Sequence, residues 1–131
     1  MIVVDTSAVL AALLARPVTS DVDERMVDDG DLQAPHLIDV EFLHVLRRLV
    51  RSRVLTEVRA SEVRSDFADL SIERYPHPPL ADRMWELRPN LTAYDASFIA
   101  LSEALSAPLI TCDARLAGSS GHGAIVEVFR G

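Results

Sequence analysis

Two aspartates stand where an apolar run ends, which is an unusual place for a charged side chain. Asp5 directly follows the run Ile2–Val4, and Asp113 directly follows the run Pro108–Cys112. Continuous apolar runs of this length are typical of buried strands in a parallel sheet that is covered on both faces. Ligands of such sheets bind beyond the carboxyl ends of the strands, so we expect both carboxylates to emerge at one ligand-binding edge.

Two further acids are candidates for the same site. Asp95 falls in the first turn of a predicted helix, where the helix dipole favours an anion, and Glu41 interrupts a largely apolar helix surface. Carboxylates gathered away from water repel one another, and a hard divalent cation compensates them together. Oxygen ligands favour Mg²⁺ or Mn²⁺ over zinc or copper. The joint pattern therefore predicts a metal site, although each acid taken singly also suits a turn or a helix start.

The segments that would position these acids alternate between strands and helices. Thr6 or Ser7 is expected to cap the first helix. Strands are predicted at 2–4, 32–34, 108–112 and 125–129, with 71–75 ambiguous, and helices at 8–14, 17–30, 35–51, 56–70, 79–87, 94–105 and 113–118. This alternation predicts one α/β domain over residues 1–131, with a mainly parallel central sheet flanked by helices in an α/β/α arrangement.

The composition excludes several classes of protein. All thirteen basic residues are arginines, so neither a P-loop nor a Schiff-base enzyme is possible, because both require a lysine. The single cysteine, Cys112, excludes an internal disulfide and a cysteine zinc site, and we expect it to be a buried apolar residue. No apolar run approaches the roughly 20 residues that span a bilayer, and no basic segment precedes the first apolar run. We therefore expect a cytoplasmic protein with no membrane association.

The net charge of −7 is unusual for a protein that binds nucleic acid, but the arginines are clustered. Arg47, Arg48, Arg51 and Arg53 fall within seven positions of the sequence, at the end of a predicted helix. Arg47, Arg48 and Arg51 are candidates for contacts with phosphates. The alternative is that they form only a solvated helix face.

The sequence resembles the PIN domain family and, within it, the VapC-type ribonuclease toxins of bacterial toxin–antitoxin pairs. The resemblance covers essentially the whole chain. It rests on four stretches that occur in the order typical of the family: Ile2–Ala8, Glu41–Arg47, Tyr94–Ser102 and Leu109–Leu116.

The resemblance implies a function. Asp5, Glu41, Asp95 and Asp113 match the four acidic positions that bind one or two Mg²⁺ or Mn²⁺ ions in the family. Such proteins cut single-stranded RNA, often within structured RNAs such as tRNA, by means of a metal-activated water. They are commonly homodimers, and a cognate antitoxin restrains them.

The same resemblance extends to the surroundings of the acids. Ser7 and Thr111 match hydroxyl positions that support the acids or metal-bound water. The chain departs from the family at His44, where an asparagine often stands three residues after the helical acid. His44 is therefore either a structural residue or a newly recruited ligand or proton shuttle.

Other functions fit the residues less well. A phosphatase of the haloacid dehalogenase type needs a second aspartate two positions after the first, where this chain has Ser7. A receiver-like signalling domain needs a lysine near the acids, and a dinucleotide-binding domain needs a glycine-rich turn after the first strand. A catalytically inactive PIN fold that acts as an RNA-binding module remains the principal alternative.

Overall fold

The central feature of the fold is a five-stranded sheet in the order β3-β2-β1-β4-β5. In the computed structural model, which describes residues 1–130, every strand pair of this sheet is parallel. The strands are β1 (Ile2–Val4), β2 (Leu32–Pro35), β3 (Ile72–Tyr75), β4 (Leu109–Thr111) and β5 (Val126–Val128). The predicted α/β class with a parallel sheet is confirmed, and β1 occupies the middle of the sheet.

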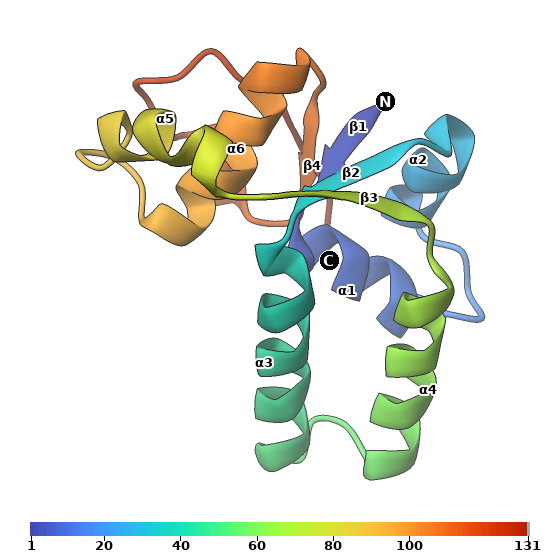
Figure 1. Cartoon of the computed structure of the whole chain (residues 1–131). Coiled ribbons are helices and arrows are strands. Elements are labelled where there is room, and N and C mark those ends of the chain that lie inside the picture. Colours follow the sequence, from blue (N-terminus) through green and yellow to red (C-terminus); the bar gives the residue numbers. More distant parts are fainter. Residues whose placement is uncertain (131) are drawn as a thin grey trace.

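Helices lie on both sides of this sheet (Figure 1). They are α1 (Thr6–Ala15), α2 (Asp21–Asp29), α3 (Leu37–Arg51), α4 (Glu57–Asp69), the 3₁₀ turn η1 (Pro78–Leu80), α5 (Ala81–Glu86), α6 (Ala93–Leu105) and α7 (Ala114–Ala117). Helix α6 packs against β1, β2 and β4, whereas α1 packs against α2, α3, α4 and β4. In Figure 1, α3 and α4 extend away from the sheet as two arms, and α5 and α6 form a lobe that packs beside the sheet.

The first two helices begin at residues other than those predicted. Helix α1 is capped by Asp5, whose carboxylate accepts the N–H of Ala8 at 2.9 Å, and not by Thr6 or Ser7. Helix α2 begins at Asp21 rather than Pro17, because the side chain of Ser20 caps it. The role of Asp5 matters because it fixes this carboxylate at the junction of β1 and α1.

Three other boundaries refine the predictions. The ambiguous segment 71–75 forms β3 by pairing with β2, and β2 continues through Pro35. The predicted helix 79–87 divides into η1 and α5. Pro78 and Pro79 occupy the first turn, where a missing backbone N–H costs no hydrogen bond.

The two arms α3 and α4 are held together by an aromatic contact. Phe42 of α3 stacks on Phe67 of α4 with ring centroids 3.9 Å apart, and both side chains are buried. This packing sets the rotation of α3, so Glu41, next to Phe42, faces another direction and is half-buried. Over residues 1–130, no helix is both long and apolar enough to cross a membrane.

Candidate active site

Asp5 is the buried centre of the site. Its carboxylate leaves the middle strand with only 6% of the residue exposed. Oδ1 accepts the hydroxyl of Ser7 at 2.7 Å and the N–H of Ala8 at 2.9 Å, and Oδ2 accepts the hydroxyl of Thr111. Burial raises the pKa of Asp5, with a smaller upward contribution from the Glu41 carboxylate, while the three hydrogen bonds lower it. The net shift of this pKa is upward, so the folded protein destabilises the ionised form of Asp5 relative to water.

Two hydroxyls join the end of β1 to the end of β4. The Thr111 oxygen accepts the backbone N–H of Asp113 at 2.9 Å, and the Ser7 oxygen accepts the N–H of Cys112 at 2.9 Å. The two hydroxyl oxygens are themselves 3.2 Å apart. Ser7 and Thr111 therefore contact Asp5 directly, and Thr111 connects Asp5 to the backbone of Asp113. Cys112, expected to be buried, is only partly so.

Glu41 approaches the site from α3. Its Oε1 accepts a hydrogen bond from the hydroxyl of Thr6, which is 35 residues away in sequence. Sequence reasoning treated Thr6 only as a possible helix cap and missed this contact. The pair of hydroxyl residues directly after Asp5 could have indicated this contact, because Ser7 donates to Asp5 and Thr6 donates to Glu41.

Asp95 and Asp113 form a second pair of neighbouring acids. Asp95 is half-buried in the first turn of α6, where its N–H donates to the hydroxyl of Thr92 at 3.2 Å. Burial raises the pKa of Asp95, and the nearby Asp113 carboxylate raises it further. Asp113 is the more acidic member, because Arg115 donates to its Oδ1 from Nε at 3.1 Å and to its Oδ2 from Nη2 at 2.8 Å and so lowers its pKa. Sequence reasoning missed Arg115, whose side chain is 88% exposed.

The acids thus lie as two pairs, Asp5 with Glu41 and Asp95 with Asp113, joined through Thr111. Among residues 1–130, no three His, Cys, Asp or Glu side chains lie close enough to form a ready-made metal site. Mg²⁺ is usually held by only one or two carboxylates and completes its shell with water and substrate phosphates. Two separate pairs of carboxylates therefore suit Mg²⁺ or Mn²⁺, which complete their shells with water and phosphate oxygens.

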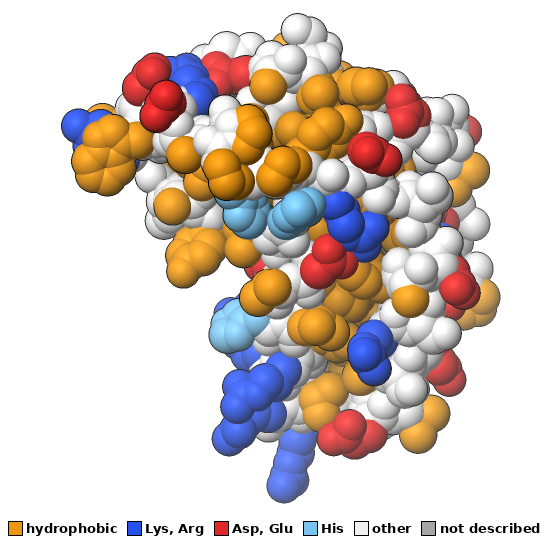
Figure 2. All heavy atoms as spheres, in the orientation of Figure 1, with side chains coloured by type: hydrophobic (Ala, Val, Ile, Leu, Met, Phe, Trp, Pro, Cys, Tyr) orange, Lys and Arg blue, Asp and Glu red, His pale blue; other side chains and the backbone are white. Residues whose placement is uncertain are grey.

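The predicted RNA-binding residues form an exposed row on α3. Arg47, Arg48 and Arg51 are exposed and make no ion pair within the described part of the chain. Figure 2 shows this basic row with a histidine above it along α3. His44 is exposed as well, and it lines a hollow that also contains Glu41.

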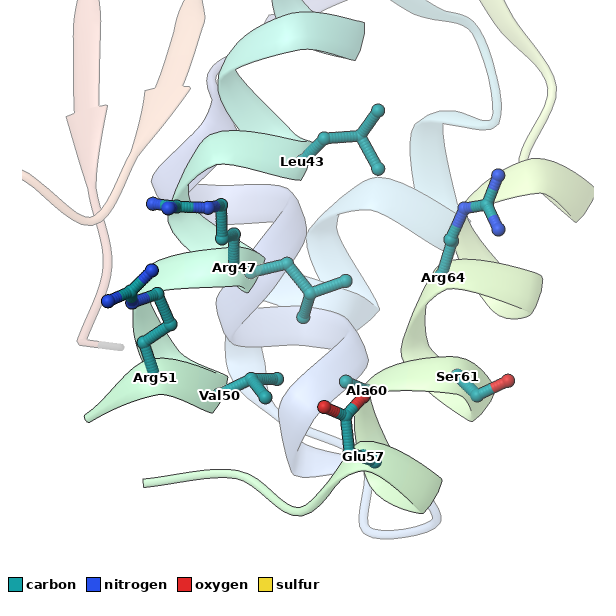
Figure 3. A pocket seen from close by; sticks show the side chains of 9 residues that line it. Leu43, Arg47, Val50, Arg51, Glu57, Ala60, Ser61 and Arg64 are labelled. Atoms are coloured by element: carbon teal, nitrogen blue, oxygen red, sulfur yellow. The ribbon is translucent and has the colours of Figure 1, made fainter. Parts of the chain in front are cut away.

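A separate groove lies between α3 and α4 (Figure 3). Its volume is about 400 Å³, and its walls include Leu43, Val50 and Ala60. None of the four acids lines it, so it is distinct from the acid site. In Figure 3 the guanidinium groups of Arg47 and Arg51 point away from α4 and out of this groove.

The family relationship is clear at the level of sequence. The family model of the PIN domain matches residues 2–118. The chain is 39% identical over 129 residues to "Ribonuclease VapC1" of Mycobacterium tuberculosis, covering 98% of this chain and 97% of that protein. It is 44% identical over 117 residues to "Ribonuclease VapC9" of the same species, covering 88% of each.

Solved structures agree with this relationship. The crystal structure of PAE2754 from Pyrobaculum aerophilum has a TM-score of 0.69 at 26% identity, covering 95% of this chain and 81% of that one. VapBC2 from Rickettsia felis, bound to a DNA fragment from its promoter, has a TM-score of 0.71 at 14% identity, covering 97% and 98%, and shows the shared fold alone. The chain belongs to the PIN domain family and, within it, to the VapC ribonuclease toxin family.

Proposed function

We propose that the protein is a Mg²⁺- or Mn²⁺-dependent endoribonuclease in which Asp5, Glu41, Asp95 and Asp113 hold one or two cations together with water and the substrate phosphate. The observation that carries the proposal is the carboxylate of Asp5. It lies buried at the end of the middle strand, beside a second acid, and burial raises its pKa. Burial of this carboxylate costs desolvation free energy, and binding of a cation offsets that cost.

Each side chain has a distinct task in this proposal. A cation bound at the acids supplies an acidic water and offsets charge on the scissile phosphate. Asp5 is fixed by three protein hydrogen bonds and so acts as a rigid ligand. Asp95 is less buried than Asp5, which suits it to orient the attacking water beside the cation that it helps to hold. Arg115 competes with a cation for the carboxylate of Asp113.

The proposed partners follow from the family. RNA is the substrate, with tRNA and other structured RNAs as candidates, and the exposed row Arg47, Arg48 and Arg51 would contact its phosphates. A cognate antitoxin would restrain the enzyme, as the name VapBC2 denotes a complex in a protein of the same fold. We further propose a homodimer that acts in the cytoplasm.

The decisive experiment compares two matched aspartate variants with the wild type. In Asp5→Asn we expect loss of RNA cleavage in Mg²⁺ and loss of the rise in Tm that Mn²⁺ produces by binding the native state. Asp69→Asn, an exposed aspartate at the end of α4, should behave as the wild type in both assays.

Two results would refute the proposal. Cleavage by Asp5→Asn at the wild-type rate would show that the acid site is wrongly assigned. A wild-type protein that binds RNA but neither cuts it nor responds to Mn²⁺ would be the inactive RNA-binding module considered from the sequence.

A further inference from the structure

A hollow adjoins the acid site between α3 and the start of α6. Its volume is about 460 Å³, and it is lined by Leu37, Val40, Glu41, His44 and Tyr94. In Figure 2 the lobe of α5 and α6 overhangs α3, and the surface is concave between them. Glu41 belongs both to this hollow and to the acid site, so whatever fills the hollow lies next to the acids.

The walls of the hollow suit a flat, mostly apolar ring with polar edges. Tyr94 is 63% exposed and immediately precedes Asp95, and Val40 is 68% exposed. Exposed apolar side chains that share one hollow and are rimmed by polar groups are typical of a ligand-binding groove. His44 and Glu41 add groups at the rim that can hydrogen-bond to a polar ring edge.

The charge around the hollow favours nucleic acid as that occupant. His44, Arg47 and Arg51 recur at three- and four-residue spacing and therefore lie along one side of α3. The line formed by His44, Arg47 and Arg51 begins at the hollow and leads away from the acids, while the chain as a whole carries a net charge of −7. A polyanion that follows the row would reach the acid pairs at its end.

We infer that this hollow is a binding site for one unpaired nucleobase next to the phosphate that is cut, with the ring of Tyr94 stacking on the base. The inference rests on the proposed ribonuclease function and names the subsite that selects where the RNA is cut. Proteins hold unpaired RNA bases by stacking them on aromatic side chains and by hydrogen bonds to their edges. Tyr94 is therefore a specificity-determining residue.

The test measures binding of a fluorescent single-stranded oligoribonucleotide by anisotropy, in the Asp5→Asn background so that the RNA stays intact. Loss of one stacked base typically weakens binding about 5- to 150-fold, and we expect Tyr94→Ala to fall in this range. Tyr94→Phe keeps the ring and should bind within about twofold of the parent. Trp85→Ala is the matched control, since Trp85 is equally exposed at 68% but lies on α5 and does not line the hollow.

A second readout uses active enzyme with Asp5 intact. Tyr94→Ala should change the distribution of cut positions in a pool of random RNA sequences, whereas Tyr94→Phe and Trp85→Ala should leave it unchanged. Unaltered affinity and cut positions in Tyr94→Ala would overturn the inference, as would an equal loss in Trp85→Ala. A change from dimer to monomer in sedimentation, with unchanged RNA affinity, would instead assign the hollow to a contact between copies of the chain.

Failure of the nuclease assignment and failure of the base site give different results in these assays. If the wild type does not cut RNA in Mg²⁺, yet Tyr94→Ala still weakens RNA binding, the base site stands and the nuclease assignment falls. If the wild type cuts RNA and the Tyr94 variants cut and bind as it does, the nuclease assignment stands and the base site falls.

Discussion

Replacing Thr111 by valine tests how the buried acid is held. The Thr111 hydroxyl is fully buried, donates to Asp5 and accepts the N–H of Asp113 at 2.9 Å. Valine has nearly the same shape, so the substitution removes both hydrogen bonds while leaving little empty space. The expected cost is therefore electrostatic rather than steric.

The magnitude follows from the two partners of the hydroxyl. A hydrogen bond to a charged group contributes about 1.5–3 kcal/mol, and leaving a partly buried N–H without an acceptor costs about 1 kcal/mol. We expect Thr111→Val to lower the free energy of unfolding by about 3 kcal/mol at pH 8. About two thirds of this cost depends on the charge of Asp5.

The charge-dependent part has a defined pH dependence. Burial raises the pKa of Asp5, and the Thr111 hydroxyl is the largest of the effects that lower it, so the variant has the higher pKa for this group. The stability that Thr111 gives to the charge is complete above the folded pKa of Asp5 in the variant, and it is lost as the pH falls through that value toward the lower folded pKa in the wild type. The difference between variant and wild type should therefore shrink as the pH is lowered from 8.

Urea unfolding at pH 8 and at a series of lower pH values, without divalent cations, measures the difference. Thr111→Ser is the control, because it keeps the hydroxyl and loses one buried methyl group. It should cost about 1 kcal/mol at every pH. A cost for Thr111→Val that stays constant down to the lowest pH at which both proteins fold would refute the reasoning, since it would show that the hydroxyl does not stabilise a charge on Asp5.

Three further predictions address the second acid pair and the basic row. Asp95→Asn should abolish RNA cleavage yet raise metal-free stability at pH 8, because it removes a partly buried charge next to Asp113; a lowered urea midpoint would contradict this. Arg115→Gln should tighten Mn²⁺ binding, measured by calorimetry, because Asp113 loses its competing guanidinium; an unchanged Kd would show that the two do not compete. The double variant Arg47→Gln, Arg51→Gln should reduce the salt dependence of single-stranded RNA binding by about 1.4 in the log–log slope, and a wild-type slope would leave these arginines as a solvated face.

Much of the framework was predictable because its signals are local. The apolar run before Asp5 and the one before Asp113 predicted two strands whose ends share an edge, and both are parallel neighbours in the sheet. The helix predicted at 94–105 placed Asp95 in its first turn, and α6 begins one residue earlier, at Ala93. The cap of α1 was wrong: aspartate is as good a cap as serine or threonine, and Asp5 had been considered only as the end of a strand.

By itself, the sequence determined which residues carry negative charge at the ends of elements, because periodicity and capping act over a few neighbouring residues. Only the tertiary structure decided how those charges are compensated. Thr6 reaches Glu41 across 35 positions, Thr111 reaches Asp5 across 106, and Tyr94 shares a hollow with a helix that ends more than 40 positions earlier. These contacts depend on how the strands pair and on how the helices pack on the sheet, and that packing is set by the whole core rather than by any local pattern.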